Sequence, residues 1–256
     1  MKIFDSYARY YDLLYSTKDY VGEALFVDQN IVLNNGQKGD LLELGCGTGK
    51  HAIELARLGW RVEGVDQSES MVLQAKNRAL DVDAELQKSL AFQVGDVRKY
   101  RSKKKFNVVL SLFHVVSYQT KTSDLRAQFM TAWQHLESDG LFFFDFWYGP
   151  AVLTDKPTVR VKRLNDADLE VTRIAEPELL TEKNQVIVNY QLFLKNRQKS
   201  EVIELKESHP MRYLFIPEIE EYLNTAGFDL IRTGTWKTNL PVSQNAWYAF
   251  AVARKR

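Results

Sequence analysis

The stretch Leu41-Leu42-Glu43-Leu44-Gly45-Cys46-Gly47-Thr48-Gly49 joins an apolar run to a glycine-rich turn, and a second apolar run, residues 61–65, ends at Asp66. This order predicts a strand, a turn, a helix and a second strand ending in a carboxylate, which is how a parallel α/β sheet holds a nucleoside. Glycine lets the backbone approach a bulky ligand, and a carboxylate can accept hydrogen bonds from both hydroxyls of a ribose. A dinucleotide site needs a further glycine where this chain has Lys50, so we expect a ligand other than a dinucleotide.

A third polar element, Gly95-Asp96-Val97, follows the next apolar strand, Phe92-Gln93-Val94. A carboxylate there can accept a hydrogen bond from the exocyclic amine of adenine, beside an apolar floor. Taken alone, Asp96 is equally well explained as a turn residue or a helix cap. Three such elements at strand ends, in this order, favour a nucleoside site.

The composition of the chain limits its partners. Among 256 residues, 34 lysines and arginines nearly balance 33 aspartates and glutamates, so no overall field attracts nucleic acid or an anionic membrane. Cys46 is the single cysteine, which rules out an intrachain disulfide. The start of the chain meets an acid too early for a signal peptide, and the most apolar run, residues 141–148, is too short to span a bilayer. We therefore expect a soluble cytoplasmic protein with a small-molecule partner, and a homodimer stays open.

The apolar patterning up to residue 149 alternates helices and strands, which is typical of a parallel α/β sheet. We expect helices at 5–15, 20–34, 49–58, 69–78 and 122–137, and strands at 40–44, 61–65, 91–94, 106–111 and 140–146. From residue 158 to about 214 the sequence alternates and is rich in β-branched residues, which predicts an inserted antiparallel sheet. Pro217 then opens a helix at 218–225, and strands at 229–236 and 246–254 close the chain.

Together these motifs resemble those of the class I S-adenosylmethionine-dependent methyltransferases. The resemblance rests on residues 41–49, 64–71, 95–98 and 106–110. It implies an α/β, Rossmann-like fold, with a mostly parallel seven-stranded sheet whose last strand is antiparallel. It also implies that the cofactor is S-adenosyl-L-methionine, which leaves as S-adenosyl-L-homocysteine.

The resemblance also assigns cofactor-binding roles. In that family the glycine turn lies against the methionine part of the cofactor, the acid after the second strand holds the ribose, and the acid after the third strand marks the adenine pocket. By resemblance these roles fall to Gly45, Gly47, Asp66 and Asp96, with Glu43 near the methionine end and Gln67 and Met71 near the adenine. The expected cofactor-binding set further includes Tyr11, Tyr20, Cys46, Gly95, Val97 and Leu112.

A narrower resemblance lies at the N-terminus. Tyr11-Asp12-Leu13-Leu14-Tyr15, followed by Lys18-Asp19-Tyr20 and Glu23, resembles the start of the sugar N,N-dimethyltransferases that act on nucleotide-linked amino sugars. Residues 113–118 and the aromatic run 144–148 resemble the same enzymes, whereas the inserted sheet departs from them. In those enzymes the N-terminal helices fold over the cofactor, and the residue at the position of Tyr118 lies near the acceptor amine.

The loop after the strand at 106–111 carries the candidate catalytic residues. Methyl transfer from a sulfonium to nitrogen requires two positioned reactants and the exclusion of water, and a base takes the proton that the amine sheds. Tyr118 and His114 are the candidates, although His114 is also explained as a loop or packing residue and an unperturbed tyrosine is a poor base at neutral pH. Trp147 and Tyr148 are candidate substrate-binding residues, because flat aromatic faces bind sugars and bases, although both also suit a core.

The remaining histidines, His51, His135 and His209, lack metal-ligand spacing, so we predict no metal. The leading interpretation is a methyltransferase acting on a small molecule, above all the amine of a nucleotide-linked amino sugar. Residues 1–150 and 216–256 then form the cofactor-binding catalytic domain with an N-terminal helical lid, and residues 151–215 form an acceptor-binding β subdomain. The alternatives are O-methylation of another metabolite, an RNA acceptor, which the balanced charge does not favour, and a nucleoside-binding protein without turnover.

Overall fold

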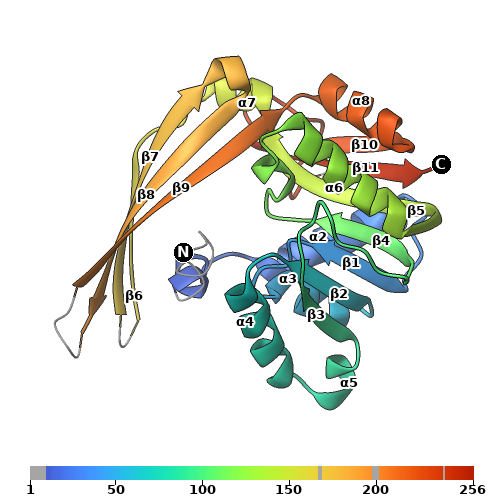
Figure 1. Cartoon of the computed structure of the whole chain (residues 1–256), viewed down its shortest axis with the longest axis horizontal. Coiled ribbons are helices and arrows are strands. Elements are labelled where there is room, and N and C mark those ends of the chain that lie inside the picture. The colour runs from blue at the N-terminus through green and yellow to red at the C-terminus, as the bar shows by residue number, and fades with distance from the viewer. Residues whose placement is uncertain (1–9, 167–168, 198–201, 239) are drawn as a thin grey trace.

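The computed structural model describes residues 10–166, 169–197, 202–238 and 240–256, and its centre is a mostly parallel sheet (Figure 1). The strands of that sheet are β1 (Asp40–Leu44), β2 (Arg61–Asp66), β3 (Leu90–Val94), β4 (Phe106–Ser111), β5 (Leu136–Tyr148), β10 (Phe228–Thr235) and β11 (Tyr248–Lys255). They lie in the order β3-β2-β1-β4-β5-β11-β10, with β11 antiparallel to both of its neighbours. This confirms the predicted seven-stranded sheet, with its last strand antiparallel.

Helices cover both faces of this sheet, as the alternating strand residues require. On one face lie α2 (Tyr20–Leu33), α3 (Lys50–Arg57) and α4 (Glu69–Leu80), and on the other α6 (Thr122–His135) and α8 (Ile216–Ala226). Along β5, Phe143 packs toward α2, whereas Phe142 and Phe144 pack toward α6 and α8. An apolar core packs on each face of the sheet and holds the strands in place. The loops at the carboxyl ends of the strands are therefore anchored to well-packed strands. Among the described residues, no helix combines the length and apolar content needed to cross a membrane.

A second sheet extends from the first, and it is antiparallel as predicted. Its strands are β6 (Arg160–Asn165), β7 (Leu169–Leu180), β8 (Gln185–Asn196) and β9 (Val202–Leu214). It joins the parallel sheet where β9 pairs with β5 at Trp147 and Tyr148. In Figure 1 the long strands arch away from the parallel sheet, and the helical segment at residues 10–14 lies between the two. Tyr10 and Leu14 of that segment pack against Val171 and Leu192 of the second sheet.

The predicted elements are confirmed, with differences at their ends. Residues 10–14 are helical, while residues 5–9 of the predicted first helix lie outside the described residues. The helix predicted to reach residue 137 ends at His135, because Leu136 already pairs with Phe106 of β4. Two short helices, α5 (Ala84–Gln87) and α7 (Gly149–Thr154), were not predicted. In α7, Pro150 lies in the first turn, where a missing N–H costs nothing, so it starts a helix instead of only ending the strand.

Candidate functional site

A cavity of about 700 Å³ opens at the carboxyl ends of the parallel strands. The glycine turn after β1, the end of β2 and the loops after β3 and β4 form one part of its wall, and the face of β7, β8 and β9 forms another. The predicted site residues that line it are Tyr11, Tyr20, Gly45, Cys46, Gly47, Asp66, Gln67, Met71, Asp96, Val97, Leu112, His114, Tyr118 and Trp147. The cavity therefore brings together groups that the sequence places up to 136 positions apart.

Three predicted site residues do not line this cavity. Glu43 is buried beneath the glycine turn, and Gly95 lies between Val65 and Tyr100. The ring of Tyr148 packs against the core formed by α6 and α8, so its packing suits the core role that the sequence left open better than substrate binding. Trp247, which directly precedes β11, and Tyr248, its first residue, line the cavity. The sequence analysis predicted a strand at 246–254 and assigned these two residues no role in binding.

The glycine turn is held by the neighbouring strand. The amides of Gly45 and Cys46 both donate to the carbonyl of Val65, at 2.7 and 3.1 Å, and Gly45 has a φ of +84°. A Cβ on Gly45 would lie 2.5 Å from Cγ2 of Val115, whereas a Cβ on Gly47 would meet no atom of the described residues within 4 Å. Gly47 thus presents bare backbone to open space, which suits the close approach of a ligand.

Asp66 is oriented by the backbone around it. Its Oδ2 accepts from the amide of Gly47 at 3.0 Å, and its Oδ1 accepts from the amide of Ser68 at 2.9 Å. Burial raises the pKa of this carboxyl, and the backbone hydrogen bonds oppose that rise. A carboxylate offers about four acceptor positions, so each oxygen keeps one for a ribose hydroxyl. The side chain is thereby fixed in place before any ligand arrives.

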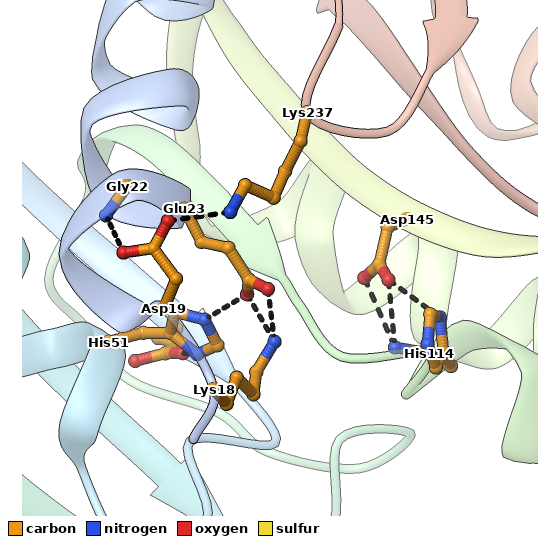
Figure 2. Close-up of polar contacts among 9 residues, drawn as sticks. Lys18, Asp19, Gly22, Glu23, His51, His114, Asp145 and Lys237 are labelled. Carbon is orange, nitrogen blue, oxygen red and sulfur yellow. Dashed lines mark hydrogen bonds and ion pairs between the residues drawn. The ribbon is translucent and has the colours of Figure 1, made fainter. Parts of the chain in front are cut away.

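Ionisable side chains gather around the buried Glu23 and His51 (Figure 2). Nε2 of His51 lies 2.8 Å from Oε2 of Glu23, and Lys18 bonds both oxygens of the same carboxylate. Burial alone would raise the pKa of Glu23, but the hydrogen bond from His51 and the charges of His51 and Lys18 lower it to about 2. Nδ1 of His51 lies 3.9 Å from Oε1 of Glu43, whose Oε2 has no hydrogen-bond partner among the described residues. Buried polar atoms usually have a hydrogen-bond partner, so the unpartnered oxygen distinguishes Glu43 from the buried Glu23.

Stability should depend on pH through Glu43. Burial raises its pKa from 4.5 to about 8, and the charge of Asp66 adds to the rise. The folded state therefore holds a proton that the unfolded chain releases, so the free energy of unfolding falls as pH rises from about 4.5 to 8, by on the order of several kcal/mol. Glu43→Gln should remove most of this slope and be the more stable protein at pH 8. Urea unfolding of both proteins at several pH values measures it, and parallel slopes would contradict the assignment.

The adenine end differs in detail from the expectation. Asp96 lines the cavity, but its carboxylate is hydrogen-bonded to Arg98. Nε of Arg98 lies 2.9 Å from Oδ1 of Asp96, and Nη2 lies 2.6 Å from Oδ2. The hydrogen bond from Arg98 lowers the pKa of Asp96, and Arg98 also bonds Asp124 at 2.9 Å. The contact of Asp96 with an adenine amine stays a prediction, and Met71 and Val97 supply an apolar wall beside it.

The loop after β4 is strained and held by a buried acid. Phe113 and His114 have φ values of 62° and 65°, a conformation that side chains rarely adopt and that costs of order 1–3 kcal/mol each. The amide of His114 donates to both oxygens of Asp145 on β5, at 3.1 and 3.2 Å, and Nδ1 of the ring lies 2.7 Å from Oδ2 (Figure 2). The other side of the ring stacks on Tyr248, with centroids 4.6 Å apart. Asp145 thus offsets the strain and fixes the imidazole.

Tyr118 reaches the second sheet. Its hydroxyl lies 2.9 Å from Nδ1 of His209 on β9, and burial raises its pKa well above the usual value. The cavity face of that sheet also carries Arg173, Ala175 and Pro177 of β7, Val186, Val188 and Tyr190 of β8, and Met211 of β9. The sequence shows that residues alternate along these strands, but it does not show which of the two faces of the sheet lines the cavity. The sequence analysis therefore missed Tyr190 and treated His209 only as a non-metal histidine.

The order of the strands, the bare turn at Gly47 and the fixed carboxylate of Asp66 define the Rossmann-like fold of the S-adenosylmethionine-dependent methyltransferases. Within the described residues, no three His, Cys, Asp or Glu side chains are grouped so as to hold a metal ion. The comparisons with known proteins agree with that class. Residues 41–140 match the model of a family described as a methyltransferase domain.

Two relatives extend the match. A dTDP-3-amino-3,4,6-trideoxy-alpha-D-glucopyranose N,N-dimethyltransferase of Streptomyces venezuelae is 31% identical over 151 residues, which is 58% of this chain and 60% of that protein. The putative methyltransferase YqeM of Bacillus subtilis is 24% identical over 254 residues, 99% of this chain and 97% of that one. The predicted resemblance to sugar N,N-dimethyltransferases is confirmed at this level, although the match to the first relative spans less than two thirds of its length.

Solved structures share the fold over nearly the whole chain. An S-adenosylmethionine-dependent methyltransferase from Clostridium acetobutylicum superposes with a TM-score of 0.81 at 21% identity, covering 98% of both chains. DesVI of Streptomyces venezuelae superposes with a TM-score of 0.79 at 23% identity, covering 97% of this chain and 98% of that one. The fold class predicted from the glycine turn is therefore confirmed.

Proposed function

We propose that the protein transfers a methyl group from S-adenosyl-L-methionine to the amine of a sugar carried on a nucleotide. The observation that carries this proposal is the single cavity that runs from Gly47 and Asp66 to Tyr118, Tyr190 and Trp247. One end has the features of a nucleoside site, and the other has an aromatic and cationic wall. A donor and an acceptor can thus meet inside one enclosure that limits water.

The residues at the first end fit the cofactor. Asp66 would accept from the ribose hydroxyls, and the bare turn at Gly47 would admit the ligand beside it. Bound there, the cofactor supplies a methyl group on a positively charged sulfur. The protein mainly positions the reactants, because charge leaves sulfur during the transfer and an uncharged amine needs little further activation.

The opposite wall supports an anionic, sugar-bearing acceptor. Aromatic rings of Trp147, Trp247 and Tyr248 suit the apolar faces of pyranose rings, and Arg160 and Arg173 suit a diphosphate. Two of the relatives found are named for dTDP-linked amino sugars, as dimethyltransferases of Streptomyces species. We therefore assign acceptor binding to the inserted segment 151–215 together with the loop before β11, and cofactor binding to residues 1–150 and 216–256.

The loop residues would then have distinct roles. His114, fixed by Asp145, would form the side of the acceptor pocket and orient the substrate, and Tyr118 would contact the amine. A panel of acceptors tests the proposal through the release of S-adenosyl-L-homocysteine. dTDP-linked amino sugars should turn over, whereas dTDP-linked sugars with a hydroxyl in place of the amine should not. Equal turnover of the hydroxyl compounds would favour the O-methylation alternative, and none with any acceptor would contradict catalysis.

Arg160 should affect the binding of the acceptor without affecting the chemistry. It lies on the cavity face of β6, opposite Ala175 of β7, and it is exposed. Arg160→Gln should raise KM for a nucleotide-linked acceptor about fivefold, since an exposed ionic contact contributes about 1 kcal/mol, and should leave kcat unchanged. Arg163→Gln, on the opposite face of the same strand, is the matched control. Equal effects of the two substitutions in steady-state kinetics would argue against a diphosphate at this wall.

A further inference from the structure

Three buried polar side chains and the partly buried Tyr118 form a continuous chain at the acceptor end of the cavity. The hydroxyl of Tyr118 lies 2.9 Å from Nδ1 of His209, and Nε2 of His209 lies 3.3 Å from Oε2 of Glu207. Oε1 of Glu207 accepts from the hydroxyl of Tyr10 at 2.6 Å. His209 is 2% exposed and Glu207 is 8% exposed, so water does not compete for these bonds. The chain links the loop after β4, strand β9 and the N-terminal segment.

The carboxylate sets the tautomer of the histidine. Because an ionised carboxylate only accepts hydrogen bonds, Nε2 of His209 must carry a proton to face Glu207. In the neutral ring Nδ1 is then an acceptor, and Tyr118 donates its hydroxyl proton to it. The phenolic oxygen has two lone pairs, so Tyr118 can also accept a hydrogen bond from a donor that arrives in the cavity. An amine or ammonium N–H is such a donor.

We propose that Tyr118, His209 and Glu207 form a proton relay that deprotonates the ammonium of the bound acceptor before methyl transfer, an inference that rests on the proposed function. The N–H bond of the ammonium breaks and its proton passes to the Tyr118 oxygen, while the proton of Tyr118 passes to Nδ1 of His209. The electron pair left on nitrogen is then free to attack the methyl group. The imidazolium faces the carboxylate of Glu207, and its proton leaves to water after the product departs.

A relay explains the arrangement better than a tyrosine acting alone. Burial disfavours the ionised form of Tyr118, so a free phenolate is not available at neutral pH, whereas a concerted transfer never charges the oxygen. Among the described residues, the side chains placed against His209 include Tyr118, Glu207 and Tyr190, whose ring centroid lies 5.0 Å away. The guanidinium of Arg173 lies 4.9 Å from the centre of the Tyr190 ring. Glu207 is an acid, and its Oε2 lies 3.3 Å from Nε2 of the ring, so a carboxylate faces the imidazole when the proton arrives.

The pH profile of kcat/KM separates this role from a structural one. His209→Asn keeps a hydrogen-bond acceptor for Tyr118 but cannot hold the proton. At pH 7 it should lower kcat/KM by about 100-fold or more, the usual scale of general acid–base catalysis. The deficit should shrink to a few-fold near pH 10, where an aliphatic amine loses its proton to the solvent. A deficit that stays constant with pH would overturn the relay.

A second substitution and a spectroscopic measurement distinguish the loss of the relay from the loss of the folded structure. Glu207→Gln should lower kcat/KM at pH 7 by about 10-fold with the same recovery at high pH, and Glu204→Gln, an exposed acid of the same strand, should change nothing. Nitrogen-15 spectra of the imidazoles test the relay without turnover. They should find the Nε2–H tautomer at His209, and the Nδ1–H tautomer would overturn the relay even if no acceptor were methylated. Absence of all turnover in the wild type, with the expected tautomer, would instead count against the proposed function.

Discussion

Asp66→Ala should weaken the binding of S-adenosyl-L-methionine about 100-fold. Two hydrogen bonds from ribose hydroxyls to a carboxylate contribute roughly 3 kcal/mol together, and the substitution removes both. It also frees the amides of Gly47 and Ser68, which Asp66 holds at 3.0 and 2.9 Å, so the turn loses part of its order. Isothermal titration calorimetry with the cofactor measures the change directly.

Two controls sharpen that experiment. Asp66→Asn keeps one acceptor oxygen and the shape of the side chain, so it should retain an intermediate affinity. Asp81→Ala, at the exposed C-terminal end of α4, should bind as the wild type does. Undiminished affinity in Asp66→Ala, with the protein folded, would mean that the cofactor is held elsewhere.

The second large effect is expected from Asp145→Ala, which should lower kcat about 100-fold. The buried carboxylate is the partner that holds the amide of His114 in its strained conformation, and without it the loop can relax to an ordinary one. A displacement of about 1 Å in groups that position a substrate is enough for a loss of this size. Steady-state kinetics with an amino-sugar acceptor measures it.

Asp145→Asn is the matched variant, because its amide oxygen can still accept from the His114 amide. It should recover most of kcat if the role of Asp145 is to hold the loop. Cofactor affinity should stay near that of the wild type in both variants, since the cofactor end does not depend on this acid. Equal losses in the alanine and asparagine variants would instead assign the effect to the charge facing the His114 ring.

The cofactor end of the cavity could be predicted because its signals are local. Glycines at positions 45 and 47 and an acid at 66 belong to one strand–turn–helix–strand unit, in which sequence spacing fixes spatial neighbours. Parallel strands then bring Asp96 and the loop with His114 to the same edge. Glu43 lies under that turn instead of in the wall, because alternate residues of a strand face opposite ways.

The acceptor end could not be predicted in the same way. Its pairs join distant residues, with Tyr118 and His209 separated by 91 positions and Tyr10 and Glu207 by 197. They meet through the register of β8 and β9, and a register shift of one residue would turn His209 away from the cavity. No local pattern in the sequence specifies that register, so Tyr190 was missed.

Transfer of a deuterated methyl group tests the central claim most directly. The protein would be incubated with S-adenosyl-L-methionine labelled on its methyl group and a dTDP-linked amino sugar, and the sugar analysed by mass spectrometry. We predict that the label appears on the sugar nitrogen, together with an equivalent amount of S-adenosyl-L-homocysteine, and that Asp66→Ala abolishes both at low cofactor concentration. An unlabelled amine in the presence of a folded, cofactor-saturated wild type would contradict the account.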